Sequence, residues 1–382
     1  MEDKAKIWFF TDIHGSNACF KKFLNLPKNE NKPNVLIIGA DITGKTIIPI
    51  VESNNGVRVV PLGGKEVKIR PNEVSTLKEK LSDIGFYPCE FSEHEYRQFI
   101  QDKQKQREVF DRLVKERLEE WVKWADAKLP SSDECIVIIN AGNDDPMYVD
   151  AILDTSKKII RPEEKVIDLP AGLKLLSTGY STPTPWNCPR DISEEDMKTK
   201  IASMTSQVNG NDKLIFNFHC PPKNSSLDLA NKIDTKTLIK QTGLGKNPTI
   251  SAGAQSIREA IELWKPIASL HGHIHEVHAK EMIGKTACFN PGTDYSNGRL
   301  QGVFLQINKD GIIEYDVLTQ ERQSAKLEGE EDNVLSTIIS SIPLIGTIYK
   351  NYTSSKKSKE TDKTLKQIKD DINEIKNNLN GK

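Results

Sequence analysis

Several short apolar runs of this sequence end in side chains that can bind a metal ion. In chain order these side chains are Asp12, His14, Asp41, Asn143, His219, His273 and His275. Carboxylate, amide and imidazole donors without a thiolate suit Mn²⁺, Fe or Zn²⁺ better than a structural zinc site built from cysteine. Because residues two apart in an extended chain point the same way, we expect each closely spaced pair to present both donors on one face. Two metal ions are the natural number for this many donors.

The apolar runs themselves predict the strands that must position these donors. They are rich in β-branched and aromatic residues, and polar residues follow each of them: "KIWFFTDIHG", "NVLIIGADITG", "CIVIINAGNDD", "KLIFNFHCPP" and "IASLHGHIHE". Runs of this length and composition suit strands that are buried on both faces. The ligands of an α/β sheet gather at the carboxyl ends of its strands. We therefore expect an α/β fold in which these strand ends meet at one site.

The composition argues against several classes of partner. The chain of 382 residues has 53 basic and 54 acidic residues and a formal charge of -1, so no overall field attracts nucleic acid or an anionic membrane. Six cysteines lie scattered without C-x-x-C spacing, which is typical of reduced thiols in a reducing compartment. We expect no signal peptide and no transmembrane span. The predicted location is therefore the cytoplasm.

A long insertion at about 45–130 separates the second apolar run from the third. Its stretch "GVRVVPLGGKEVKIR" predicts a hairpin that turns at Gly63 and Gly64. From about Ser92 to Lys128, apolar residues at i, i+3 and i+4 predict one long helix. The insertion is either a cap beside the site or a helical extension of the core, and the sequence leaves both alternatives open.

The composition changes after about Arg322. We expect a main domain over residues 1–320, a polar linker over 321–333 and a C-terminal tail over 334–382. The uncharged stretch Val334 to Tyr349 is shorter than the roughly 20 residues of a membrane-spanning helix. Apolar residues at alternating spacings of three and four, from Leu365 to Leu379, predict a short coiled-coil-like helix. Such a helix would join a second copy of the chain or a partner protein; the alternative is that its lysines only keep the tail soluble.

The motifs "DIHG", "GADITG", "NAGNDD", "NFHCPP" and "HGHIHE" resemble, in this order, the five signature blocks of the calcineurin-like metallophosphoesterases. Segments between and after them, such as "STGYSTPTPWNCPRDISEED" and "FNPGTDYSNGRLQG", resemble a branch of predicted phosphoesterases related to the bacterial cyclic-AMP phosphodiesterase. The resemblance covers about Lys4 to Leu318. It implies a four-layer αββα sandwich, to which the helical and hairpin insertion and a helical C-terminal tail are added.

The resemblance also implies a ligand set and a chemistry. One metal would be bound by Asp12, His14 and His275 and the other by Asn143, His219 and His273, with Asp41 bridging the two. Mn²⁺ is the first choice for both, and Fe, Zn²⁺ or Ni²⁺ are alternatives. Two cations about 3.5 to 4 Å apart can hold a bridging hydroxide, lower its pKa and stabilise the attacking and leaving oxygens at phosphorus. The implied activity is hydrolysis of a phosphoester.

The third motif departs from the pattern of the phosphatases. Many members of the family carry histidine directly after the metal-binding asparagine, where it is thought to assist the leaving oxygen, but Asp144 follows Asn143 here. A carboxylate beside two cations stays ionised and donates a proton poorly. Either the substrate has a good leaving group, or another residue supplies the proton, or Asp144 orients the ligands. His271 is the candidate substitute for the missing donor, and its alternative role is to support the ligands beside it.

Two further residues are candidate substrate contacts. Asn17, just after "DIHG", could donate to a phosphate oxygen or could be a turn residue. Arg258 in "SIREAI" could neutralise a substrate phosphate or could pair with an acid on its own helix. No G-x-x-x-x-G-K-[ST] loop is present, so an ATPase function has no support.

The missing histidine favours phosphodiesters over simple monoesters. The predicted function is therefore metal-dependent hydrolysis of a phosphodiester or a nucleotide-like phosphoester, with a nucleotide or an oligonucleotide as the bound partner. One alternative is a nuclease acting on DNA or RNA, although a polyanion-binding protein usually carries a basic surface that the balanced charge does not indicate. Another is a scaffold or interaction protein with this fold, although every metal-ligand position is filled.

Overall fold

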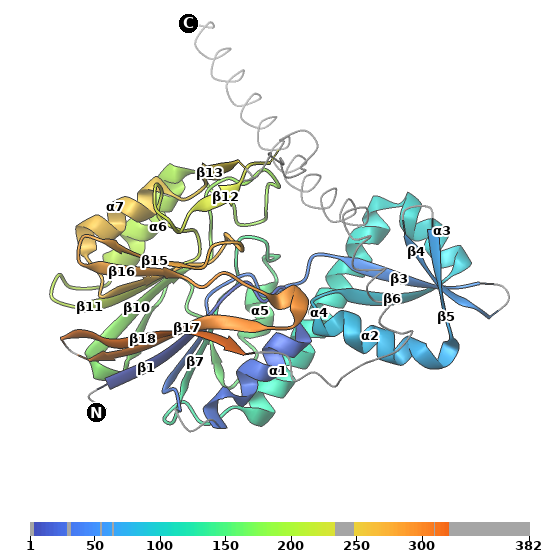
Figure 1. Cartoon of the computed structure of the whole chain (residues 1–382), viewed down its shortest axis with the longest axis horizontal. Coiled ribbons are helices and arrows are strands. Elements are labelled where there is room, and N and C mark those ends of the chain that lie inside the picture. The colour runs from blue at the N-terminus through green and yellow to red at the C-terminus, as the bar shows by residue number, and fades with distance from the viewer. Residues whose placement is uncertain are drawn as a thin grey trace, which may run out of the picture.

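Two six-stranded sheets lie face to face at the centre of the protein (Figure 1). The computed structural model describes residues 4–28, 32–53, 56–62, 65–233, 248–308 and 310–320. The first sheet has the order β18-β17-β1-β2-β7-β8, with β1 Lys4–Phe10, β2 Val35–Ile38, β7 Ile136–Ile139, β8 Ile159–Ile160, β17 Leu300–Asn308 and β18 Gly311–Gln320. The second has the order β15-β16-β14-β11-β10-β9, with β9 Val166–Leu169, β10 Leu173–Thr178, β11 Lys213–Phe218, β14 Ala268–Leu270, β15 Ala279–Ile283 and β16 Thr286–Asn290.

The inner strands of each sheet run parallel. In the first sheet β1, β2, β7 and β8 pair in parallel, and in the second sheet β10, β11, β14 and β16 do so. The antiparallel strands β17 and β18 complete one sheet, and β9 and β15 complete the other. The carboxyl ends of parallel strands open on the same edge of a sheet, which is where the polar motifs of the sequence begin.

Alternation along β1 divides its side chains between two apolar layers. Ile7 and Phe9 are fully buried and face the second sheet, where they belong to one cluster with Leu175. Trp8 and Phe10 point to the other side, into the cluster beneath the helices that cover the first sheet. Burial on both faces explains why this run is apolar at every position.

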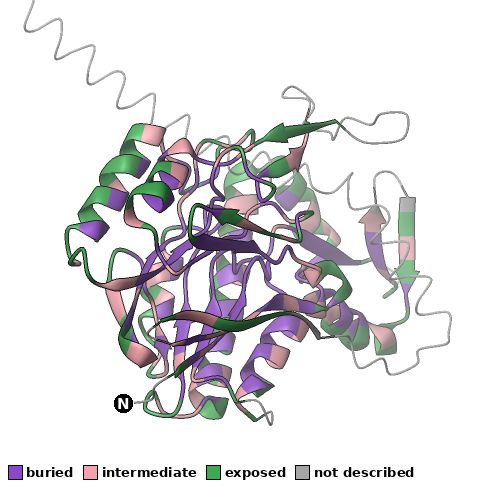
Figure 2. Cartoon of the chain, turned by 60° about the vertical axis from the view of Figure 1, so that its left-hand side comes forward, coloured by how far each residue is buried: buried purple, intermediate pink, exposed green. Residues whose placement is uncertain are grey.

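Helices cover the outer faces of both sheets. α1 (Asn17–Asn25), α4 (Lys103–Lys128) and α5 (Val149–Leu153) pack on the first sheet, and α6 (Glu194–Thr205) and α7 (Gln255–Trp264) pack on the second. Figure 2 shows the buried strands between helices whose outward faces are exposed. A short antiparallel ribbon of β12 (Leu229–Asn231) and β13 (Thr249–Ser251) lies beside the second sheet. The four-layer αββα sandwich expected from the sequence is therefore confirmed.

Residues 47–101 form a small lobe beside the sandwich (Figure 1). Its sheet has the order β5-β4-β3-β6, with β3 Ile47–Glu52, β4 Arg58–Leu62, β5 Lys65–Ile69 and β6 Tyr87–Ser92. The helices of the lobe are α2 (Val74–Asp83) and α3 (Glu93–Gln101). The strands β4 and β5 pair antiparallel where the sequence predicts a hairpin, and the turn at Gly63 and Gly64 lies outside the described residues.

The structure divides the helix expected from about Ser92 to Lys128 into α3 and α4. Between them the backbone of Asp102 is extended, with φ -112° and ψ 107°. Its side-chain oxygen accepts hydrogen bonds from the backbone N–H groups of Gln104 and Lys105, at 2.8 and 3.2 Å. An aspartate in this position satisfies donors that have no partner at the start of a helix. The side chain of Asp102 therefore begins a second helix where the apolar periodicity alone predicts continuity.

α4 is part of the core. Phe110, Val114 and Leu118 are buried in the cluster beneath the first sheet, and the ring of Trp121 stacks on Phe20 with centroids 4.1 Å apart. The C-terminal half of the insertion thus extends the core, whereas a capping role for the lobe remains a prediction. The linker at 321–333 and the tail at 334–382 lie outside the described residues. Within the described ranges, no helix is long and apolar enough to cross a membrane.

The buried side chain of Arg117 joins α4 to two other parts of the molecule. Its Nη1 donates to the carbonyl of Gly15 at 2.5 Å, in the loop that follows β1. Its Nη2 donates to the Ser82 hydroxyl at 2.9 Å and to the carbonyl of Phe86 at 3.2 Å, both in the lobe. One guanidinium therefore connects the sandwich, its covering helix and the lobe.

The cap at the start of α4 gives a stability prediction. Replacing Asp102 by Ala should lower the free energy of unfolding by about 1 kcal/mol, because two backbone N–H groups lose their acceptor. Asp102→Asn is the matched control and should stay near the wild type, since asparagine caps about as well. Urea unfolding followed by tryptophan fluorescence measures both. An alanine variant as stable as the asparagine variant would contradict the assigned cap.

Candidate metal centre

The loops at the strand ends bring the predicted ligands together. Asp12 and His14 follow β1, Asp41 follows β2 and Asn143 follows β7, all in the first sheet, and all four are buried. The second sheet supplies His219 after β11, and His273 and His275 after β14. The two sheets thus contribute donors from opposite sides of the space between their strand ends.

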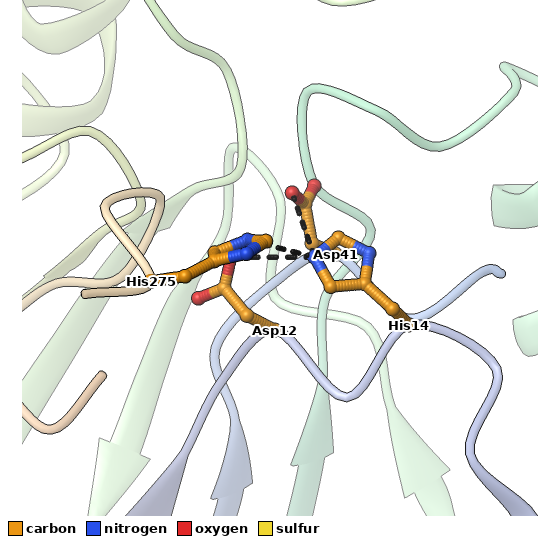
Figure 3. Close-up of side chains that lie close together, drawn as sticks. All are labelled: Asp12, His14, Asp41 and His275. Carbon is orange, nitrogen blue, oxygen red and sulfur yellow. Dashed lines mark hydrogen bonds and ion pairs between the residues drawn. The ribbon is translucent and has the colours of Figure 1, made fainter. Parts of the chain in front are cut away.

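Four of these residues converge in one half of the site (Figure 3). The ligand atoms of Asp12, His14, Asp41 and His275 all lie within 4.8 Å of one another. Nε2 of His275 lies 2.9 Å from Nε2 of His14 and 3.2 Å from Oδ1 of Asp12. One proton can join two imidazole nitrogens at this distance, and a divalent ion with nitrogen and oxygen ligands can take its place. This half fits a metal ion.

The other half gathers around Asn143. Its Oδ1 lies 3.1 Å from Nε2 of His219 and 3.1 Å from Nδ1 of His273. Oδ2 of Asp41 lies 3.4 Å from Nε2 of His219 and 3.8 Å from Nε2 of His14. The carboxylate of Asp41 therefore stands between the two halves of the site.

Neighbouring groups fix the orientation of the donors. The carbonyl of Thr43 lies 3.3 Å from Nδ1 of His14, so Nε2 is the nitrogen that faces the site. Nδ2 of Asn143 donates to Asp191 at 3.0 Å, which leaves its Oδ1 turned toward the imidazoles. Supports of this kind set the ring orientation and the basicity of metal ligands.

Asp145 ties two of the ligand loops together. Its carboxylate accepts from the backbone N–H groups of Ile42, Thr43 and Gly142, at 3.0, 2.8 and 2.7 Å. Burial raises the pKa of Asp145, and these hydrogen bonds act against that rise. The second aspartate of "GNDD" thereby holds the loop of Asp41 against the loop of Asn143.

The backbone of the loops is unusual at the donors themselves. Asp12, His14, Asp41 and His273 have positive φ angles of 54°, 38°, 49° and 69°. Non-glycine residues adopt such angles rarely, and the cost is of the order of 1–3 kcal/mol each. β1 ends at Phe10 and β14 at Leu270, so the paired donors are not on extended strands. The expectation that strand alternation places each pair on one face is therefore wrong; tight turns bring the donors together.

Two glycines allow the loops to approach one another. A Cβ atom on Gly142 would lie 1.9 Å from Oδ1 of Asp41, and one on Gly272 would lie 2.2 Å from Oδ2 of Asp12. Both contacts are with carboxylates of predicted ligands, so larger residues would displace these side chains.

Burial and mutual charge shift the protonation of the donors when no ion is bound. Burial raises the pKa of Asp41 to about 6, although the nearby His219 acts to lower it. Burial lowers the pKa of His219, but the charges of Asp41 and Asp12 outweigh it and raise that pKa to about 9. At neutral pH the proton on His219 therefore supplies positive charge that a divalent ion would otherwise provide.

His271 does not lie with the donors. It is fully buried, and its Nδ1 lies 2.7 Å from the carbonyl of Phe218 and 3.2 Å from that of Cys220. Burial lowers the pKa of His271 to about 4, so the ring is neutral at pH 7. A neutral imidazole that donates its N–H to backbone carbonyls has no proton for a leaving group. The structure gives His271 a role in holding the loop of His219.

Asp144 lies at the site but is not a proton donor. Its Oδ2 pairs with Nζ of Lys45, and its Oδ1 accepts from the thiol of Cys188 at 2.7 Å. Burial raises the pKa of Asp144, but Lys45, His14 and Cys188 together bring it well below its usual range. The carboxylate is therefore ionised, as its position after Asn143 predicts.

The two candidate substrate contacts lie elsewhere. The side-chain oxygen of Asn17 accepts from Nε1 of Trp121 at 2.7 Å and is buried. Nε of Arg258 donates to Glu262 on its own helix at 2.9 Å, and its Nη1 donates to the carbonyls of Lys223 and Asn224. Both side chains thus make structural contacts, and their geometry does not support the role in binding phosphate.

Sequence reasoning missed Lys45 and Tyr295. Lys45 follows "GADITG" directly, so its place next to a ligand motif was the available signal. The ring of Tyr295 lies 4.9 Å from the ring of His14 and 6.3 Å from that of His275. Tyr295 is within the quoted segment "FNPGTDYSNGRLQG", but nothing in the local pattern indicates that its ring reaches two ligands that belong to other motifs.

The raised pKa of His219 gives a pH prediction for metal binding. A ligand imidazole must lose its proton before it binds, so Mn²⁺ binding at pH 7 should release about one proton from this residue. Because the pKa of His219 without an ion is about 9, the affinity should rise with pH, by up to about tenfold per unit, until about pH 9. Calorimetric titrations in two buffers of different ionisation enthalpy count the released protons. An affinity for Mn²⁺ that is the same at pH 6.5 and 8.5 would contradict the assigned proton.

Comparisons with known proteins give distant similarities. No protein-family model matches the chain. An uncharacterized protein of Methanocaldococcus jannaschii is 28% identical over 162 residues, which cover 42% of this chain and 65% of that protein. The matched region thus spans less than two thirds of that relative's length. Among solved structures, the protein TT1561 of Thermus thermophilus is 10% identical with a TM-score of 0.45, over 84% of this chain and 99% of that one. A 5'-nucleotidase precursor from the same organism is 10% identical with a TM-score of 0.34, over 90% and 59% of the two chains.

The resemblance to a family rests on features of the chain itself. The five motifs follow one another in the expected order, each after a strand of one of the two sheets. Their polar side chains converge at the carboxyl edge of a four-layer sandwich, in an arrangement that suits divalent ions. In motif order, fold and site, the chain resembles the calcineurin-like metallophosphoesterases.

Proposed function

We propose that the protein is a binuclear metallophosphoesterase that hydrolyses phosphodiesters or nucleotide-like phosphoesters. The observation that carries the proposal is the position of Asp41, whose Oδ2 lies between His14 of one group of donors and His219 of the other. A carboxylate in this position can bind two ions at once. Two divalent ions at such a site lower the pKa of a shared water and neutralise charge that develops on a phosphoryl group.

Two groups of residues would bind the two ions. In the proposed assignment Asp12, His14 and His275 hold one ion, Asn143, His219 and His273 hold the other, and Asp41 touches both. The side chain of His275 is 31% exposed, whereas those of His14 and His219 are fully buried, so substrate reaches the site from the side of His275. Mn²⁺ is the proposed metal because the donors are oxygen and imidazole.

The state of Asp144 supports a preference for diesters. Its ionised carboxylate is paired with Lys45 and cannot protonate a leaving group. Because Lys45 balances the charge of Asp144, the preference rests on the absence of a histidine after Asn143. The proposed location is the cytoplasm, because all six cysteines are buried free thiols.

Metal content tests the proposed pair of ions. After loading with Mn²⁺ and dialysis, the wild type should hold two ions per chain, and Asn143→Ala should hold about one. Atomic emission measures the content, and near-ultraviolet circular dichroism checks that the variant is folded. His278→Ala is the control, because His278 lies outside the donor cluster. One ion in the wild type would contradict the binuclear assignment.

Turnover tests the proposed activity. The Mn²⁺-loaded protein should hydrolyse bis(4-nitrophenyl) phosphate with a higher kcat/KM than 4-nitrophenyl phosphate. Asp41→Asn should lower kcat by at least about 100-fold without unfolding the protein, since the carboxylate shared by both ions is lost. Faster hydrolysis of the monoester would overturn the diester preference. A wild type inactive on both esters, with metals bound, would count against phosphoester hydrolysis itself.

A further inference from the structure

Lys45 is a cation at the candidate metal centre that the ligand assignment does not use. It stands in the loop between β2 and β3, four residues after Asp41, and its side chain is 32% exposed. Its ammonium pairs with Asp144, the residue directly after Asn143. After Asp144, the groups whose charges act most on Lys45 are Tyr295 and Asp41. The ammonium is therefore close to the ligand cluster and is also in contact with solvent.

Asp144 is itself held in place, so its partner has a defined position. The backbone N–H of Asp144 donates to Oδ1 of Asp41 at 3.2 Å. The thiol of Cys188 donates to Oδ1 of Asp144 at 2.7 Å, and burial together with the charge of Asp144 keeps the pKa of that thiol well above its usual value. One carboxylate oxygen is thus occupied by the thiol, and the other is left for Lys45.

Other cations near the ligand loops are fully engaged in structure. Arg190 is 1% exposed and forms two hydrogen bonds with Asp150, at 2.9 and 3.1 Å. Arg117 donates to the carbonyls of Gly15 and Phe86. An ammonium has three donors, and Lys45 uses one of them on Asp144, which leaves others for a ligand that enters from solvent.

The reaction needs a donor at the oxygen that leaves. When the bond between phosphorus and this oxygen breaks, the electron pair stays on the oxygen, and negative charge develops there. A preorganised cation at that point is worth roughly 100- to 1,000-fold in rate. The imidazoles of the predicted donor set would be used in holding the ions, and Nδ1 of the fully buried His271 already faces the carbonyls of Phe218 and Cys220.

We propose that Lys45 binds the leaving-group oxygen of the phosphoester and that Asp144 is the positioning residue for its ammonium. The inference rests on the proposed phosphoester hydrolysis. A bond forms between a water oxygen and phosphorus while the bond to the leaving oxygen breaks. The water loses its proton to solvent, and the leaving oxygen, held by an N–H of Lys45, takes a proton from solvent. Lys45 stays charged throughout.

Two symmetric diesters whose leaving groups differ in basicity test this role. Lys45→Met should lower kcat/KM on diphenyl phosphate by about 100-fold or more, because phenolate is a poor leaving group and needs the cation. On bis(4-nitrophenyl) phosphate the loss should stay below about tenfold, since nitrophenolate carries its charge without help. Lys45→Arg should recover part of the loss, and Asp144→Asn should show a smaller loss with the same dependence on the leaving group. Equal losses on both esters would overturn the assignment of Lys45 to the leaving oxygen.

Controls separate this role from metal binding and from folding. Lys78→Met is the matched control, because Lys78 is an ion-paired lysine on the lobe, bound to Glu90 at 2.8 Å. It should leave the rates on both esters unchanged. The Lys45→Met variant should retain the metal content of the wild type and stay folded at the assay temperature, although the loss of the partner of Asp144 lowers its melting temperature. A loss of bound metal in Lys45→Met would overturn the proposal, because the effect would then come from the ligands.

The binding of inorganic phosphate tests the role of Lys45 independently of turnover. Inorganic phosphate has an oxygen in the place of the leaving group, so Lys45→Met should weaken its binding to the Mn²⁺-loaded protein by at least about tenfold in calorimetry. If the wild type bound phosphate but hydrolysed neither ester, the proposed function would fail while this comparison still tested Lys45. Equal phosphate affinities of the wild type and Lys45→Met would overturn the inference in either case.

Discussion

The structure depends on keeping negative charge and imidazole nitrogens together in a largely buried part of the protein. Asp12 and Asp41 are 1% and 2% exposed, and His14 and His219 are buried beside them. Buried carboxylates are costly unless they are paired with positive charge. A proton on His219 supplies part of that charge without an ion, and two divalent cations would supply more. Much of the surrounding chain, including Asp145, Asp191 and Thr43, orients or ties these groups rather than contacting a substrate.

The close approach of these donors explains the positive φ angles of the backbone at the strand ends. Regular strands would leave donors two residues apart separated by roughly 7 Å along one face, and would not direct them to one point. Positive φ angles at Asp12, Asp41 and His273, and glycines at 142 and 272, turn the chain sharply enough to do so. The parallel sheets then provide a rigid base, because their buried strands hold every loop at the same edge. The packing of the apolar layers beneath the loops thus holds the loops in their strained backbone conformation.

The sequence predicts the sheets and the ligands because both depend on local patterns. Apolar runs followed by polar motifs mark the buried strands and their carboxyl ends, and both expectations agree with the structure at β1, β2, β7, β11 and β14.

Contacts between residues far apart in the sequence leave no such local pattern. The pairing of Lys45 with Asp144, and the contact of Tyr295 with His14, join residues about 100 and 280 positions apart. The sequence offers His271 as a substitute proton donor or as a support for the ligands, and its contacts with the carbonyls of Phe218 and Cys220 favour the second role. The break before α4 arises from one capping side chain, which the apolar periodicity does not contain.

The contacts of Arg117 make the lobe and the metal centre mechanically dependent on each other. Its guanidinium holds Ser82 and Phe86 of the lobe and also the carbonyl of Gly15, the residue next to His14. A rotation of the lobe relative to the sandwich would have to break these buried hydrogen bonds or carry Gly15 with it. In the second case a ligand that bound only to the lobe would change the position of His14 without touching the site. α4, which carries Arg117, would then transmit a movement of the lobe at Ser82 and Phe86 to Gly15. These two parts of the chain lie some 70 residues apart in sequence.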